Sequence, residues 1–202
     1  MKKCAICLFV FLIIVSPCMA GQQLDEANSK FTYSGKPIHP FVVKEFSNWL
    51  SDNRPPMITT VDVAAASDTN KYMDSEIEKR DNWLFAKTEE IDGDVRLYES
   101  FGYHWIGQLA NGVHVLETGS SGGGSGFFMD LMFVKFSEGE IFWENKKEKQ
   151  LRMTIVGTYS LGDRYEGEIK INGNKVLIPA SADQRGGGSN DKDINLEFPD
   201  GL

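Results

Sequence analysis

The chain has 202 residues, a formal net charge of −8 and three cysteines, all within the first 18 residues. A chain of this length can bury a core without disulfide bonds. The negative charge argues against nucleic acid as a partner, because proteins bind it through basic groups that neutralise phosphates. It argues equally against electrostatic docking on anionic lipid.

The first 20 residues have the pattern of a secretory signal peptide. Met1-Lys2-Lys3 is basic, residues 5–15 are apolar, and Ala20 precedes a polar stretch. The apolar run is shorter than the about 20 residues that a membrane span needs, so we expect no transmembrane segment. Cleavage after Ala20 would leave residues 21–202, a cysteine-free chain of 182 residues with a net charge of −10. The sequence therefore predicts a periplasmic or secreted protein without thiol chemistry.

Cys18 offers an alternative, in which the leader is that of a lipoprotein and this cysteine is lipid-modified. Lipoprotein leaders carry a small residue before the cysteine, whereas this chain has Pro17 there. Lipidation is therefore the less favoured interpretation.

After the leader, residues 21–36 are polar, and we expect an extended lead-in. Residues 40–53 have apolar side chains at helical spacing, including Val42, Phe46 and Trp49. Pro40 suits a first helical turn and Pro55-Pro56 ends the helix. The sequence thus predicts one short N-terminal helix.

The rest of the chain has the short apolar runs and frequent turn residues of β structure. The predicted β segments are residues 57–66, 82–91, 95–100, a hairpin over 102–118, then 127–136, 141–143, 151–161, 164–171, 175–179 and an edge strand at 194–198. We expect a loop at 68–81, a turn at Ser137–Glu140 and a solvated turn at Lys146–Lys149. The pattern predicts an all-β fold, an antiparallel sandwich or barrel of eight or nine strands, in a single domain over 21–202.

Asn111-Gly112 is the strongest hairpin signal in the chain. The register that it predicts determines the sheet face to which the side chains of His104 and His114 point. With these two as the central turn residues, Leu109 pairs with His114. Because side chains alternate along a strand, His104 and His114 then point to opposite faces. We therefore expect no shared metal, with His114 packed among aromatic rings and His104 beside Glu117.

The most unusual local feature is the glycine and serine run from Gly119 to Gly126. It lacks the Gly-Lys-Ser/Thr ending and following helix of a phosphate-binding loop. It is either a flexible or kinked connection or a loop that contacts a ligand. Asp130 follows it within an apolar strand and is either a functional carboxylate or a marker of the solvent face. The predicted binding residues are Ser120, Ser121, Gly122, Gly123, Gly124, Ser125 and Asp130.

No nucleophile motif, metal-ligand motif or cofactor motif occurs in the chain. A two-carboxylate hydrolase stays open, because carboxylates are plentiful at Glu117, Asp130, Asp163, Glu166 and Glu168. Trp49, Trp83, Trp105 and Trp143 lie in apolar contexts and are expected in the core rather than on a sugar-stacking surface.

The block from Gly112 to Phe136, with the lead-in Ser34–Pro40, resembles segments of small exported bacterial β-rich proteins to which no function is assigned. The resemblance implies a recurring β domain with a Gly/Ser loop and implies no activity, cofactor or site residue. We expect a non-catalytic binding or interaction module with a protein or glycan partner. The alternatives are a carboxylate-dependent hydrolase of envelope or extracellular polymer, and an envelope assembly partner that adds a strand to another protein's sheet.

Overall fold

The computed structural model describes residues 19–47, 58–63, 75–92, 95–181 and 192–201. The helices are α1 (Met19–Lys30) and α2 (Pro40–Lys44). The strands are β1 (Thr32–Tyr33), β2 (Lys36–Pro37), β3 (Thr60–Asp62), β4 (Ile77–Arg80), β5 (Trp83–Asp92), β6 (Val95–Gln108), β7 (His114–Ser121), β8 (Phe128–Trp143), β9 (Lys146–Asp163), β10 (Lys170–Asn172), β11 (Lys175–Ile178) and β12 (Ile194–Glu197). The predicted all-β antiparallel architecture is confirmed, with short additional strands such as β4 inside the expected loop.

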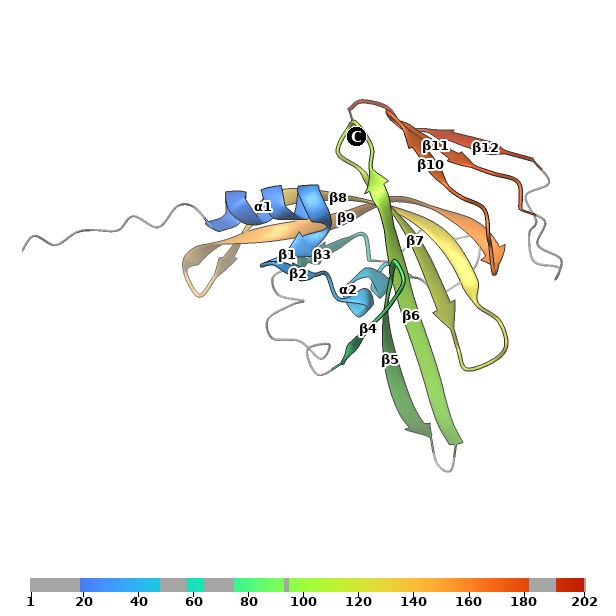
Figure 1. Cartoon of the computed structure of the whole chain (residues 1–202). Helices are drawn as coiled ribbons and strands as arrows, with labels where there is room; N and C mark the ends of the chain where they lie inside the picture. The colour runs from blue at the N-terminus through green and yellow to red at the C-terminus, as the bar shows by residue number, and fades with distance from the viewer. Residues whose placement is uncertain (1–18, 48–57, 64–74, 93–94, 182–191, 202) are drawn as a thin grey trace, which may run out of the picture.

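A seven-stranded antiparallel sheet is the largest element, and its strand order is β3-β9-β8-β7-β6-β5-β4 (Figure 1). Its two edge strands, β3 and β4, are not hydrogen-bonded to each other, so the sheet is open in the described part of the chain. Of the two predicted alternatives, the sandwich therefore fits and the barrel does not.

Both faces of this sheet carry a hydrophobic core. On one face, α1, α2 and the β1–β2 hairpin cover a core that includes Phe101, Tyr103 and Leu116. On the other face, the three-stranded sheet β10-β11-β12 covers a second core that includes Val115, Leu131 and Phe133. We call these the helix face and the small-sheet face. Adjacent residues of β7 and β8 alternate between them, as the pleat of a strand requires.

The segment predicted to be an extended lead-in forms α1, so that prediction was wrong. Three apolar side chains spaced by three and four residues, Leu24, Ala27 and Phe31, bring the otherwise polar helix onto the helix face. Phe31 ends the helix with a positive φ of 53°, which an aromatic residue seldom adopts. Its ring is only 2% exposed, so burial holds the residue in this conformation.

The predicted helix at 40–53 is shorter than expected, because α2 ends at Lys44 with Glu45 as its C-cap, and the described residues 45–47 are not helical. Residues 48–57 lie outside the described part. Pro40 begins it as expected, and the side chain of His39 accepts a hydrogen bond from the N–H of Phe41 (3.2 Å). The phenolic O–H of Tyr103 donates to the carbonyl of Ile38 (2.7 Å) and so fixes the entry to α2 against β6. Burial raises the pKa of Tyr103.

The β6–β7 hairpin forms where Asn111-Gly112 predicts it, but its register differs from the prediction. Leu109 donates to Val113 and accepts from Gly112, so the loop is longer and His114 pairs with Gln108 instead of Leu109. A bulge between Trp105 and Gly107 then shifts the pairing by one more residue. Together the two shifts move the pairing by two residues, and because side chains alternate faces with a period of two, the predicted faces of the two histidines are nevertheless correct.

β8 and β9 form a long hairpin in place of the turn predicted at Ser137–Glu140, so that prediction was also wrong. These residues continue β8, and the side chain of Arg152 occupies the space beside Gly139 that a Cβ would otherwise fill. The chain turns instead at Glu144-Asn145, both with positive φ (47° and 62°), as a type I′ hairpin turn requires. The predicted solvated turn at Lys146–Lys149 is the exposed start of β9.

Candidate functional site

The predicted glycine and serine loop is shorter in the structure than in the sequence pattern. Gly119, Ser120 and Ser121 still belong to β7, and only Gly122–Phe127 separate it from β8. Gly123 needs its glycine for a φ of +86°, whereas a Cβ at Gly122 or Gly124 would meet nothing within 4 Å. Gly122 to Ser125 are exposed. The segment is thus an open connection, and ligand binding by it stays a prediction.

Asp130 lies on the helix face, with Thr118 of β7 and Ser160 of β9 as its neighbours across the sheet. Burial raises the pKa of its carboxyl, and a hydrogen bond with Ser160 opposes that rise. Ser120 shares this face two positions along β7, whereas Ser121 points to the other. A half-buried carboxyl with a raised pKa is typical of functional sites, but a structural polar row across the sheet explains it equally well.

The two histidines of the β6–β7 hairpin have the environments expected of them. His114 is 0% exposed and lies 5.1 Å from Phe136 and 5.6 Å from Phe31 between ring centroids. Burial lowers its pKa to about 4. His104 lies on the small-sheet face, with Nδ1 3.5 Å from a carboxylate oxygen of Glu117. A metal shared by the two rings is therefore excluded by the sheet between them.

The structure does not bring together Glu117 and Asp130, two of the five carboxylates considered for a hydrolase. Glu117 lies on the small-sheet face and Asp130 on the helix face, so the sheet separates them. Asp163 accepts the N–H of Phe127 (2.8 Å) and pairs with Arg164 (3.0 Å). Within the described ranges, no group of three or more His, Cys, Asp or Glu side chains is arranged to hold a metal ion.

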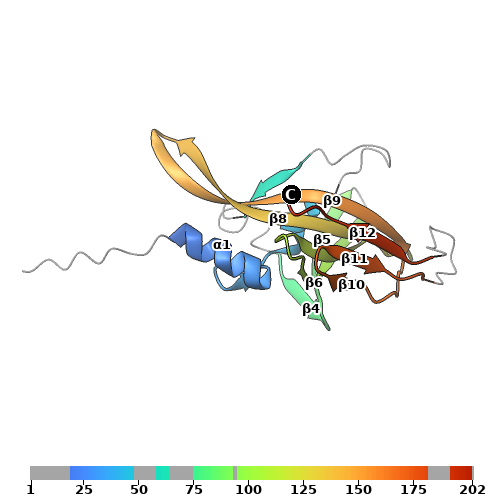
Figure 2. The same cartoon turned by 90° about the horizontal axis from the view of Figure 1, so that it is seen from above.

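A different region stands out, namely the far end of the β8–β9 hairpin, residues 137–150, which we call the arm. Beyond Val134, β8 pairs only with β9 in the described residues, and β9 pairs with β3 only over Arg152–Thr154. Figure 2 shows this end of the hairpin projecting away from the rest of the chain, near α1. The arm is therefore a two-stranded ribbon with solvent along most of its length.

The tip of the arm carries three large apolar side chains that water surrounds. Ile141, Phe142 and Trp143 are 40%, 67% and 61% exposed. The expectation that Trp143 lies in a core was wrong; Trp83 and Trp105 are partly buried against the two cores, and Trp49 lies outside the described residues. The pairing places Trp143 beside Lys146 on one face and Phe142 beside Lys147 on the other.

The charges around this tip are mixed rather than of one sign. Lys147 forms an ion pair with Glu140 (3.0 Å), and Glu144, Lys146 and Glu148 lie within the same exposed ribbon. Such exposed pairs contribute little to stability. An apolar tip inside a rim of both signs is typical of a protein contact surface, and sequence reasoning missed it because exposure depends on which strands have neighbours.

Comparisons with protein-family models, with curated proteins and with solved structures give no match. Neither described helix is long and apolar enough to cross a membrane. The function must therefore be inferred from the side chains that the fold presents.

Proposed function

We propose that this protein is an exported, non-catalytic interaction module, and that the tip of its arm enters an apolar site on a protein partner. The observation that carries the proposal is the exposure of Ile141, Phe142 and Trp143 at the end of a projecting hairpin. Contiguous exposed apolar patches with a polar rim commonly mark the sites at which proteins bind other molecules.

The energetics suit an anchor. Full burial of a large apolar side chain contributes about 1.5–3 kcal/mol, and aromatic anchors dominate many interfaces. Because Phe142 and Trp143 are already partly buried (67% and 61% exposed), together they offer about 2–4 kcal/mol before the cost of association. A protein site suits this tip better than an anionic bilayer does, because Glu140, Glu144 and Glu148 offset the lysines of the arm and the whole chain is acidic.

The proposal is tested by co-purification of the tagged chain from envelope extracts after mild crosslinking. The arm variant replaces Phe142 and Trp143 together by Ser, and the matched control is Phe128→Ser, because Phe128 is 61% exposed at a different place. We expect partner proteins with the wild type and the control and none with the arm variant. Identical partners for all three, or arm-dependent sedimentation with anionic phospholipid vesicles, would contradict the proposal.

Export is part of the same proposal and is supported by the leader pattern of residues 1–20. Cleavage after Ala20 would give an N-terminus at Gly21, whereas processing as a lipoprotein would leave a lipid-modified Cys18. The mass of the mature protein distinguishes the two, and we expect an N-terminus at Gly21. A lipid-modified Cys18 would overturn this part of the proposal.

A further inference from the structure

Three aromatic rings gather on the small-sheet face, and we call Trp83, Phe85 and Phe127 the aromatic surface. The rings of Trp83 and Phe85 are stacked, with centroids 5.5 Å apart and planes 14° apart. The ring of Phe127 lies 6.0 Å from Trp83 and 6.1 Å from Phe85. All three are partly exposed.

Two glycines fix these rings on the sheet. A Cβ at Gly102 would overlap the ring of Phe85, and a Cβ at Gly119 would overlap the ring of Phe127. The two glycines pair with each other across β6 and β7, so the rings cover adjacent stretches of bare backbone. This packing holds the aromatic surface in place before any ligand arrives, which lowers the entropy cost of binding.

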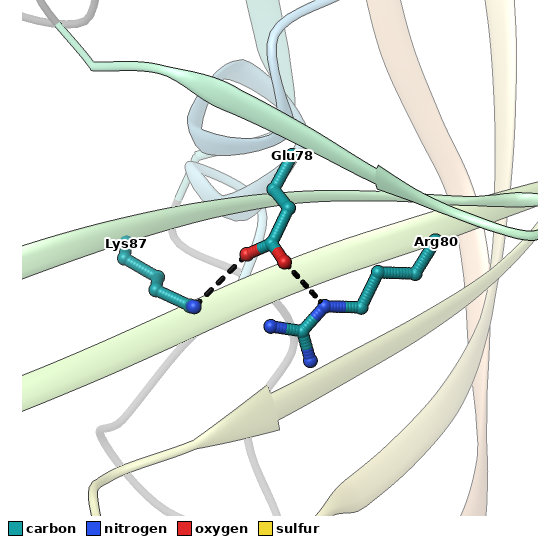
Figure 3. A network of polar contacts seen from close by, with 3 residues as sticks. All are labelled: Glu78, Arg80 and Lys87. Carbon is teal, nitrogen blue, oxygen red and sulfur yellow. Dashed lines mark hydrogen bonds and ion pairs between the residues drawn. The ribbon is translucent and has the colours of Figure 1, made fainter.

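Charged groups flank the aromatic surface on the β4 side, where Glu78 forms ion pairs with both Arg80 and Lys87 (Figure 3). Arg80 Nε donates to Glu78 (2.7 Å) and Lys87 Nζ to the other carboxylate oxygen (2.9 Å). The hydrogen bond from Arg80, followed by that from Lys87, lowers the pKa of Glu78 to about 2. The Arg80 guanidinium also lies 5.5 Å from the centroid of Phe85, as in a cation–π contact.

The opposite flank is formed by the pair His104 and Glu117. Their side chains are 27% and 13% exposed, and the ring of His104 lies 6.1 Å from that of Trp83. Donors and acceptors of hydrogen bonds thus stand on both sides of a fixed, partly exposed set of rings.

We propose that the aromatic surface binds a saccharide chain. The apolar face of a pyranose ring packs on an aromatic ring, and its hydroxyl groups both donate and accept hydrogen bonds, so the flanking Arg80, Glu78 and Glu117 suit them. An apolar peptide would form no hydrogen bonds with these flanking side chains, and nucleic acid is disfavoured by the net charge of −8. This site is separate from the arm and does not depend on the function proposed for it.

The test is affinity electrophoresis of the mature protein through gels containing soluble β-glucan or xylan, with a pull-down on purified peptidoglycan. Phe127→Ala is compared with Phe128→Ala, a matched control, because the neighbouring ring is exposed and belongs to the helix-face side of β8. We expect retention of the wild type and of Phe128→Ala by at least one of these polysaccharides, and a loss of about tenfold in apparent affinity for Phe127→Ala.

Three further variants test the position of the Phe127 ring and the charge of one flanking side chain. Gly119→Ala displaces the ring of Phe127 without removing it, whereas Gly122→Ala places its methyl group in open space. Glu117→Gln keeps the size of a flanking side chain and removes its charge. We expect weaker retention for Gly119→Ala and Glu117→Gln than for Gly122→Ala. No retention of the wild type on any of the three polysaccharides, or equal retention of folded Phe127→Ala and wild type, would overturn the proposal.

Discussion

His114 makes the stability of this protein sensitive to acid, and the replacement His114→Gln tests that dependence. The indole N–H of Trp105 donates to Nδ1 of His114 (3.1 Å), so the neutral ring carries its proton on Nε2. The side-chain nitrogen of Gln108, a hydrogen-bond donor, lies 3.1 Å from Nε2 and does not accept that proton. A second proton would have to sit on Nδ1, facing the indole donor, in a site closed by Phe31 and Phe136.

The magnitude follows from the pKa of His114, which burial lowers from 6.5 to about 4. The unfolded chain takes up a proton as the pH falls through about 6.5, while the folded protein does not until about pH 4. Stability is therefore complete above pH 7 and is lost as the pH falls between these values. At about 1.36 kcal/mol per pKa unit, the loss is about 2 kcal/mol at pH 5 and about 3 kcal/mol at pH 4.

The assay is urea unfolding at intervals from pH 7.5 to pH 4.5, for the wild type and His114→Gln. The variant is expected to be less stable at pH 7.5 but to lose about 2 kcal/mol less than the wild type on going to pH 5. Burial also lowers the pKa of His39, and this contribution, like those of the carboxylates, is common to both proteins and cancels in the comparison. Equal slopes against pH would refute the reasoning.

Three further substitutions have defined outcomes. Tyr103→Phe leaves the carbonyl of Ile38 without its buried donor, so we expect a loss of about 1–3 kcal/mol in urea unfolding, and an unchanged midpoint would contradict this role. His39→Ala removes the helix cap and should cost about 1 kcal/mol, whereas His39→Asn should restore much of it in the same measurement. Asp130→Asn removes a carboxylate whose charge burial disfavours, so thermal unfolding at pH 7 should show equal or higher stability, with the difference shrinking as acid protonates the wild-type carboxyl. A marked loss at pH 7 would show that the charge of Asp130 is needed.

The elements that follow local rules could be predicted from the sequence. The hairpin at Asn111-Gly112, the tight turn at Asn172–Asn174 and the edge strand β12 carry their signals within a few residues. The alternation of apolar side chains likewise places Val115 and Leu116 on different faces. Fold class follows from the number and spacing of such signals.

Other elements depend on partners distant in the chain. α1 has only a narrow apolar face, so its helix becomes evident only when β8 and β9 provide a surface for Ala27 and Phe31. In the sequence, Glu144-Asn145 is a weaker turn signal than Ser137–Glu140, yet the chain turns at Glu144-Asn145. Gly139 lies within β8, where the side chain of Arg152 packs beside it. Local turn residues were therefore outweighed by cross-strand packing.

The candidate sites were the least accessible to sequence reasoning. The loop and Asp130 stand out in the sequence, whereas the exposure of Phe142 depends on where β7 and β3 stop pairing with the long hairpin. The aromatic surface likewise depends on the register that aligns Gly102 with Gly119. Both follow from strand pairing, which no local pattern specifies.

The most direct test of the central claim is site-specific photocrosslinking in cells, with a benzophenone side chain at Phe142 and, as the control, at Phe128. Both positions are more than half exposed, so general collisions label them equally. If the arm enters a site on a partner, the probe at Phe142 yields a discrete crosslinked protein that Trp143→Ser abolishes, and the probe at Phe128 does not yield it. The same products at both positions, or only lipid adducts at Phe142, would contradict the claim.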